Sequence, residues 1–244
     1  MEAVFVVAST SIEGANLPTA EQDPQALSLA ERYAPHIHCD RREPFLPVVV
    51  GYTIFISNGP SPSFPRYIEL APPTKLAIEY AIWWDWDITH LYELEHIWVY
   101  VGEKGEVVHA EGSWHGRYHP LVANGRVPLE GHHVVAYAEP GKHAFHPTSE
   151  LPPELRRFIR RRCWEEAGED GLLVTSLFEG EIVKTPEADR LASAYLRRRA
   201  FEPSFAFNRS FAVERATLLP WPSLREWIPK RIGWWLEQLR ASNL

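Results

Sequence analysis

The fold is decided by two consecutive stretches, KLAIEYAIWWD at residues 75–85 and ELEHIWVYV at residues 93–101. In the first stretch, large apolar residues recur at every second position from Leu76 to Trp84, which is the alternation of a β-strand. A turn at 102–105 leads into a third expected strand at 106–110, and a fourth is expected at 133–138. Strands this close, joined by tight turns, favour antiparallel pairing and a sandwich-like body.

Helices are expected before and after this β-rich region. Asp23 is a good N-cap with Pro24 at the first helical position, and Pro35 ends the short helix that they begin. Three more helices are expected in the last third of the chain, at residues 152–167, 185–199 and 221–240. In the last of them, Pro229 marks a kink or a fresh start.

These elements together predict an α+β fold, with an antiparallel β-sandwich-like core and peripheral and C-terminal helices. Residues 1–150 would form the β-rich region that carries the chemistry. Residues 151–244 would form a helical extension packed on the same body, as a single domain. The expected order is completed by strands at 1–7 and 47–57 and by loops at 10–23 and 58–65.

Composition excludes two classes of function. The 244 residues carry a net charge of -7, which argues against broad nucleic-acid binding because phosphate contacts need a basic surface. The arginine run at 156–162 is therefore expected to be a solvated helix face. No run approaches eighteen apolar residues, so no transmembrane helix is expected.

Smaller features bear on the compartment and source of the protein. The apolar run at residues 1–7 has no basic leader and no clear cleavage region, which predicts a cytoplasmic protein. Cys39 and Cys163 have no metal-ligand or redox spacing and are expected to be buried free thiols. Scarce Asn, Gln and Met beside plentiful Pro and Arg suit a thermophilic source.

Histidine and acid gather in one part of the chain. Nine of the eleven histidines fall between residues 90 and 146, and HLYELEH at 90–96 follows directly on the acidic stretch WWDWD at 83–87. On a strand, Glu93 and Glu95 point to one face about 7 Å apart, where like charges repel unless a cation lies between them. His96 falls on the opposite face. The sequence thus predicts a divalent metal site, in surroundings too aromatic for a plain solvated strand.

The same stretch resembles a known family motif. His90-x-x-Glu93-Leu94-Glu95-His96-Ile97 resembles His-x-x-Asp-Trp-Glu-His-Val of the vacuolar protein sorting-associated family. It is similar also to the Gly-His-Arg-His-Asp-Trp-Glu heptapeptide of necrosis- and ethylene-inducing-like proteins. The resemblance extends in order over roughly residues 32–147 and includes four further segments: Arg32 to Pro47, Ile78 to Trp84, Trp114-His115-Gly116, and Val134 to Pro147.

The resemblance implies a divalent cation on a β-sandwich flanked by helices. Its ligands, or the groups that orient them, would be His90, Glu93 and Glu95, with Asp85 or Asp87 joining and His143 or His115 closing the set. Two departures are that Glu93 stands where the family has Asp and that Leu94 stands where it has Trp. The toxins are also secreted and disulfide-bonded, so the resemblance implies a shared site and not cytolysis.

The predicted metal set is therefore Asp85, Asp87, His90, Glu93, Glu95 and His143, holding Mg²⁺, Ca²⁺, Mn²⁺ or Zn²⁺ with oxygen-preferring ions slightly ahead. An unligated His or Glu would act as general base, with His115 and His133 as the candidate catalytic residues. The leading hypothesis is a metal-dependent hydrolase acting on a sugar, phosphoester or lipid headgroup. The alternatives are a non-catalytic module in which the ion holds a glycan or lipid headgroup, and a purely structural ion. The remaining histidines, His36, His38, His109, His119 and His132, are expected to be ordinary surface or core residues.

Overall fold

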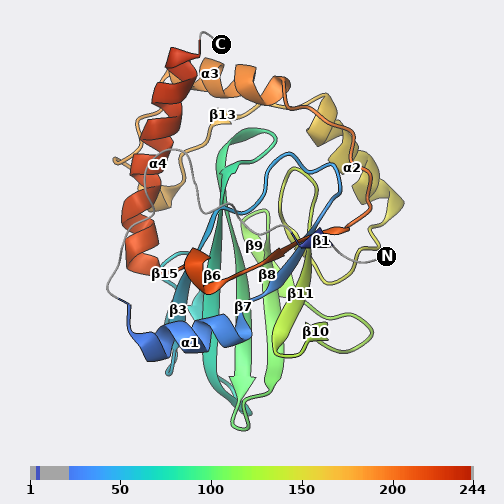
Figure 1. Cartoon of the computed structure of the whole chain (residues 1–244), viewed down its shortest axis with the longest axis vertical. Coiled ribbons are helices and arrows are strands. Elements are labelled where there is room, and N and C mark those ends of the chain that lie inside the picture. Colours follow the sequence, from blue (N-terminus) through green and yellow to red (C-terminus); the bar gives the residue numbers. More distant parts are fainter. Residues whose placement is uncertain (1–3, 6–21, 243–244) are drawn as a thin grey trace.

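The computed structural model of the chain describes residues 4–5 and 22–242. Two sheets face each other at its centre (Figure 1). The seven-stranded sheet has the order β15 (Leu218–Pro220), β3 (Val49–Phe55), β6 (Thr74–Trp86), β7 (His90–Gly102), β8 (Val107–Trp114) and β9 (Arg117–Pro120), and β13 (Gly171–Leu172) pairs with the start of β7. Its central pairs, from β3 to β9, are all antiparallel, while β15 and β13 pair in parallel.

The six-stranded sheet draws its strands from distant parts of the chain. Its order is β1 (Val4–Phe5), β14 (Arg209–Ala212), β2 (His36–Cys39), β11 (His133–Ala138) and β10 (Leu129–Glu130), and β12 (Phe145–His146) pairs with β11. The β2–β11 and β1–β14 pairs are parallel. The expected α+β sandwich is confirmed, but its sheets are mixed and not purely antiparallel. In a small antiparallel pair, β4 (Gly59–Pro60) lies within the loop expected at 58–65 and β5 (Tyr67–Ile68) lies just after it.

The helices surround the sheets. In Figure 1, α4 (Trp221–Ala241) and α2 (Pro153–Trp164) lie on opposite flanks, α3 (Pro186–Arg197) crosses the end between them, and α1 (Pro24–Tyr33) lies at the other end. Asp23 caps α1 by accepting a hydrogen bond from the Gln25 N–H at 2.9 Å, as predicted. Helix α4 continues through Pro229, so the predicted fresh start is wrong.

One apolar core joins the two halves of the chain. Leu91 of β7 and Phe145 of β12 belong to the same buried cluster as Ile159 of α2, Leu196 of α3 and Leu224 of α4. These helices stay in place because their apolar faces pack on the sheets. The packing removes apolar surface of both the helices and the sheets from water.

Smaller predictions can also be compared with the described part of the chain. Cys39 and Cys163 are free and buried, as expected. The arginines at 157, 160 and 161 on α2 are exposed. The N-terminal strand is described only at Val4–Phe5, and most of the loop expected at 10–23 lies outside the described residues. Among the residues that the structure describes, no helix is both long enough and apolar enough to cross a membrane.

Candidate metal centre

The site lies where the pairing of β7 changes partner. At its start, β7 pairs with β13 through His90 and Leu91. From Ile97 onward, the ladder on β7 continues with β8. Between these two points, no strand of the described chain pairs with β7 on this side, so residues 92–96 border an opening in the sheet. A cavity of about 440 Å³ occupies this place and is lined by Tyr92, Glu93, Leu94, Glu95 and His96 among others.

Three side chains form a group suited to a metal ion. The ligand atoms of Asp87, His90 and Glu93 all lie within 4.8 Å of one another. His90 Nε2 is 3.8 Å from Asp87 Oδ1 and 3.7 Å from Glu93 Oε2. Asp87 comes from the short connection after β6, and the other two come from β7. Among the described residues, this is the one such group of three or more acids, histidines or cysteines.

A kink in β7 brings His90 toward Glu93. On a regular strand, residues three positions apart would point to opposite faces. Tyr92, between them, has a φ of 63°, in the left-handed region that bulky residues rarely adopt. Two further residues share this strain: His115, which lines the cavity, has a φ of 47°, and His143, next to Lys142, has a φ of 62°. Strained non-glycine residues gather at functional sites more often than elsewhere, so their clustering supports a functional role here.

Burial controls the charge of the two glutamates. Burial and repulsion from Glu95 and Asp87 raise the pKa of Glu93 well above its usual value. Burial raises the pKa of Glu95 to about 7, although the Ser113 hydroxyl donates a short hydrogen bond to its Oε2. Both carboxyls therefore lack enough positive charge around them, which is the electrostatic setting that favours uptake of a cation.

The pKa values of His90 and Asp87 are lowered, in contrast to those of the two glutamates. Burial lowers the pKa of His90 to about 4, so its imidazole is neutral at physiological pH and has a lone pair to offer. Burial would raise the pKa of Asp87, but Lys142, His90 and His143 outweigh it and hold that pKa far below the usual value. Asp87 is thus a permanent negative charge.

Lys142 supplies a positive charge that the sequence interpretation did not include. Its Nζ lies 2.7 Å from Asp87 Oδ2 and also donates to Thr89 Oγ1 at 3.1 Å. Burial alone would lower the pKa of Lys142, but Asp87 and Glu93 outweigh it and raise that pKa. The sequence did contain a signal, because Lys142 lies between Gly141 and His143 inside a segment already singled out for its histidines.

His143, a predicted ligand, lies beside the triad and not in it. Its ring stacks on Trp84, with centroids 4.6 Å apart and planes at 7°. Its Nε2 is 3.4 Å from Oε1 of Glu43, a buried acid that also accepts a hydrogen bond from the Gly141 N–H at 2.7 Å. Glu43 was not predicted as a site residue. It orients the turn that carries both Lys142 and His143.

His115, predicted as a general base, lies at the rim of the cavity. It is in the two-residue turn between β8 and β9, and its Nε2 is 3.4 Å from Oε1 of the buried Glu139. Burial would lower the pKa of His115, but Glu139 and Glu95 outweigh it and raise that pKa. His146 approaches the other oxygen of Glu139 at 3.2 Å. A histidine so paired is better suited to donate a proton or a hydrogen bond than to accept a proton.

Asp85, also predicted as a ligand, belongs to a different contact. Its carboxylate accepts hydrogen bonds from Nε and Nη2 of Arg231 on α4, at 2.9 and 2.7 Å. The reason is strand alternation. Trp84 lies directly opposite Glu93 and shares its face, so Asp85, the next residue on β6, points to the other face and meets α4.

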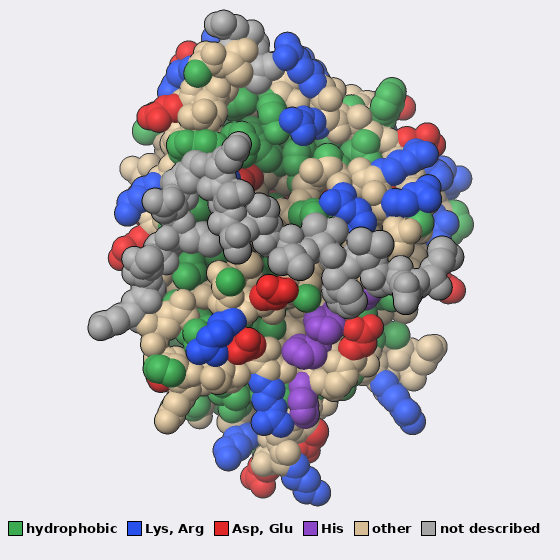
Figure 2. Space-filling view, viewed as in Figure 1, with side chains coloured by type: hydrophobic (Ala, Val, Ile, Leu, Met, Phe, Trp, Pro, Cys, Tyr) green, Lys and Arg blue, Asp and Glu red, His purple; other side chains and the backbone are tan. Residues whose placement is uncertain are grey.

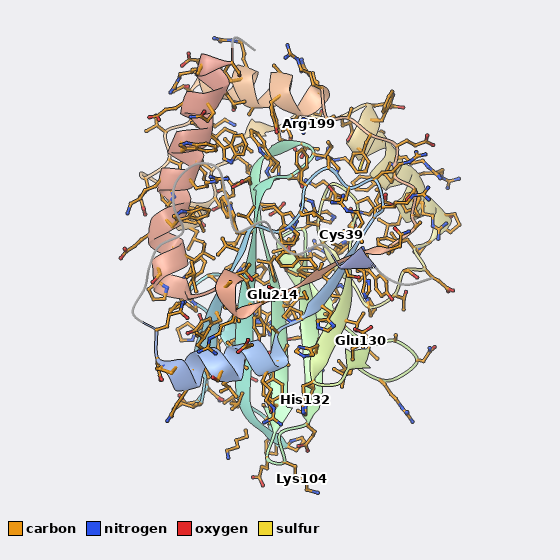
Figure 3. The ribbon with its side chains drawn as sticks, viewed as in Figure 1. Cys39, Lys104, Glu130, His132, Arg199 and Glu214 are labelled. Atoms are coloured by element: carbon orange, nitrogen blue, oxygen red, sulfur yellow. The ribbon has the colours of Figure 1, made fainter. Side chains whose placement is uncertain are left out.

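The structure does not bring His133 to the triad either. It begins β11 of the six-stranded sheet, where its Nδ1 hydrogen-bonds to the Ala34 carbonyl at 2.7 Å and its ring stacks on His36 at 4.4 Å. Imidazoles gather with acids on the face shown in Figure 2. Glu130 and His132 are labelled on this part of the molecule in Figure 3. Since β11 is in the opposite sheet, its first residue lies away from the cavity bordered by β7.

His96 confirms the alternation argument. Its Nε2 lies 2.9 Å from Ser63 Oγ, and its ring stacks on Trp98 at 5.4 Å, on the face opposite Glu95. The Ser63 hydroxyl also lies 2.6 Å from Oε1 of the buried Glu79. Burial lowers the pKa of His96 to about 3, so it acts as a neutral packing residue.

Comparison with known proteins gives limited information. No protein-family model matches the chain, and no curated protein does. The resemblance to the vacuolar sorting family therefore stays a prediction from its motifs.

Solved structures do include similar chains. One is the crystal structure of necrosis and ethylene inducing protein 2 from the causal agent of cocoa's witches' broom disease. It has 17% identity over 69% of this chain and 91% of that chain, with a TM-score of 0.34. Another is NLPPya in complex with glucosamine, which has 14% identity over 61% of this chain and 77% of that chain, with a TM-score of 0.36. A complex of NLPPya with mannosamine has a TM-score of 0.35. At TM-scores this low, the likeness carries no argument about function, which has to come from the residues of the site.

Proposed function

We propose that this protein binds a divalent cation through Asp87, His90 and Glu93 and, with its help, holds a polar ligand such as a sugar or a lipid headgroup. The observation that carries the proposal is the convergence of two carboxylates and one neutral imidazole within 4.8 Å of one another, where two of the three residues, His90 and Glu93, line a cavity. Such donors are those that divalent ions take in proteins.

The charges of the site support a doubly charged ion. Asp87, Glu93 and Glu95 carry three negative charges when ionised, and Lys142 supplies one positive charge, which leaves two negative charges over. A divalent cation would balance them. It would also lower the raised pKa of Glu93, because a nearby cation favours the ionised carboxylate.

The cavity supports a polar ligand of modest size. Its volume, about 440 Å³, lies in the range of small-molecule sites. Thr175 and Ser176 line it together with the aromatic residues Tyr92 and Phe178. Hydroxyls and rings around an ion suit a polyhydroxylated ligand, whose oxygens can complete the coordination while its apolar face packs on the rings.

A second candidate function is hydrolysis, and one observation favours it. Glu95 lines the same cavity and, when ionised, can take a proton from a water molecule as a general base. If the ion held a substrate and Glu95 activated a water molecule beside it, the protein would be a hydrolase. Without turnover, the same residues form a binding module.

The metal part of the proposal is tested by ion uptake. Protein stripped with chelator should take up one Mg²⁺, Ca²⁺, Mn²⁺ or Zn²⁺ per chain in titration calorimetry, and saturation should raise its melting temperature by several degrees (about 2.7 kcal/mol at a hundredfold excess over Kd). Asp87→Asn and Glu93→Gln should each reduce uptake at least tenfold. Glu103→Gln, in the distant turn after β7, is the control. Wild-type protein that takes up none of the four ions, with an unmoved melting temperature, would refute the proposal.

The ligand part is tested on the ion-loaded protein. Monosaccharides, including glucosamine and mannosamine, and soluble lipid headgroups should bind in the presence of the ion and be lost with chelator. Product release from ester, phosphoester or glycoside substrates that disappears in Glu95→Gln would favour hydrolysis over binding alone. Binding that persists unchanged in chelator would remove the ion from the function.

A further inference from the structure

We propose that the Lys142 ammonium competes with the divalent ion for Asp87, so that Lys142 sets how tightly and how reversibly this site binds its ion. The inference rests on the proposed function and adds to it a residue that determines ion affinity. It begins from the contact between Lys142 Nζ and Asp87 Oδ2, at 2.7 Å.

Both oxygens of Asp87 already have partners. Oδ1 accepts hydrogen bonds from the Thr89 N–H at 2.7 Å and from the Thr89 hydroxyl at 2.8 Å. Oδ2 faces the ammonium of Lys142. An ion that takes Oδ2 must displace the ammonium, and an ion that takes Oδ1 meets the ammonium across a single carboxylate. In either case, the ion gains less from Asp87 than it would from a carboxylate with no cation.

The ammonium cannot leave without a change in the site. Lys142 is 7% exposed. On the side of α2, Arg162 approaches the same Thr89 hydroxyl, with Nη2 at 3.5 Å, so a second positive group lies behind the lysine. Arg162 is itself paired with Glu166, Glu169 and Asp170, and an incoming divalent ion would add a third positive group to this place.

The backbone fixes Lys142 in this position. Gly141 and His143, on either side, have φ of 71° and 62°. The N–H groups of Lys142 and His143 both donate to the Glu139 carbonyl, at 3.2 and 2.7 Å. A Cβ on Gly141 would lie 2.8 Å from Cys163 Sγ and from Ile88, so only glycine fits this turn. The turn that aims Lys142 at Asp87 is therefore rigid, and the contact is part of the fold.

The experiment compares Mn²⁺ binding by titration calorimetry in four chelator-stripped proteins. Lys142→Met keeps the length of the side chain and removes its charge, and it is expected to bind Mn²⁺ at least tenfold more tightly than wild type. Lys142→Arg keeps the charge and should stay within about threefold of wild type. Lys104→Met removes a lysine from the turn after β7 (Figure 3), which lies at the other end of this strand from His90, and should change nothing.

Stability without the ion gives a second measurement. In chelator, Lys142→Met should melt at a lower temperature than wild type, because Asp87 loses its ammonium partner, and Mn²⁺ should raise its melting temperature by more than it raises that of wild type. If Lys142→Met does not fold, Lys142→Gln replaces it. Equal or weaker Mn²⁺ binding in the uncharged variant, with wild type binding normally, overturns the inference and leaves the proposed function standing.

Two other results separate the two proposals. If neither protein binds Mn²⁺ or any of the other three ions, the proposed function fails and the competition falls with it. If only the uncharged variant binds, the competition is supported in its strongest form, and the metal-dependent function of the wild-type chain is refuted.

Discussion

Asp85 and Asp87 lie two positions apart and take part in different structures. Asp85 is still on β6, where alternation turns it toward Arg231 of α4. Asp87 follows the last strand residue, Trp86, and the connection carries it to His90. Sequence reasoning gave the two acids equal standing as ligands because both precede the same motif. The position of each acid relative to the end of β6 decides which of them reaches the site.

At this scale we predict that Asp85→Asn is destabilising and leaves ion uptake unchanged. Arg231 and Asp85 are both buried, and Asp85→Asn removes the negative charge that faces the Arg231 guanidinium, at a cost of about 3 kcal/mol. Urea unfolding measures the loss, and calorimetry with Mn²⁺ measures uptake in the folded variant. Reduced ion affinity with unchanged stability would mean that Asp85 is a ligand after all.

At the scale of elements, the β8–β9 turn positions His115. The two residues between these strands, His115 and Gly116, have φ of 47° and 76°, which is the pattern of a type I′ turn that matches the twist of a hairpin. Glycine suits the second position because it adopts positive φ without strain. The strained histidine is kept at the first position, where its imidazole reaches Glu139.

Two glycine substitutions at this scale should have opposite signs. A Cβ at Gly116 or at Gly233 would meet no atom within 4 Å, so backbone conformation alone decides each effect. Gly116→Ala should destabilise the protein by about 1 kcal/mol because alanine resists positive φ. Gly233→Ala, inside α4, should stabilise it by about 0.5–1 kcal/mol through helix propensity. Thermal unfolding of the two variants measures both, and a shift of the same sign in both would contradict the turn geometry.

At the scale of the whole molecule, the site depends on elements that enclose it from several parts of the chain. The connection after β6 supplies Asp87, β7 supplies His90 and Glu93, and the turn before β12 supplies Lys142. Residues 173–178, from the second half of the chain, close the cavity. Part of the region after residue 150 therefore lines the candidate site and does not only cover the sheets.

We therefore propose that residues 1–150 and 151–244 unfold together. The larger buried cluster draws residues from both parts, with Ile159, Leu196 and Leu224 packed among residues of the sheets. Scanning calorimetry should show a single transition whose calorimetric and van't Hoff enthalpies agree. Leu224→Ala should lower the midpoint of that transition without splitting it. Two separate transitions in the wild-type protein would show that the helical region is an independent unit.

The sequence by itself determined what depends on neighbouring residues. Alternation along β6 and β7 is local, so it predicted the strands and put Glu93 with Glu95 and His96 on the other face. Helix caps are also local, and the start of α1 at Asp23 followed from them. The residues of the triad could be singled out for the same reason, because Asp87, His90 and Glu93 are separated by only a few residues.

Only the tertiary structure decided the contacts between distant residues. Arg231 lies 146 positions from Asp85, and its pairing removed that acid from the site. Lys142 lies 53 positions from Thr89, and Glu43 lies 98 from Gly141. His133 went to the opposite sheet because β11 pairs with β2. Such contacts depend on which strands pair and which helices pack on them. The pattern of side chains along one strand does not predict either.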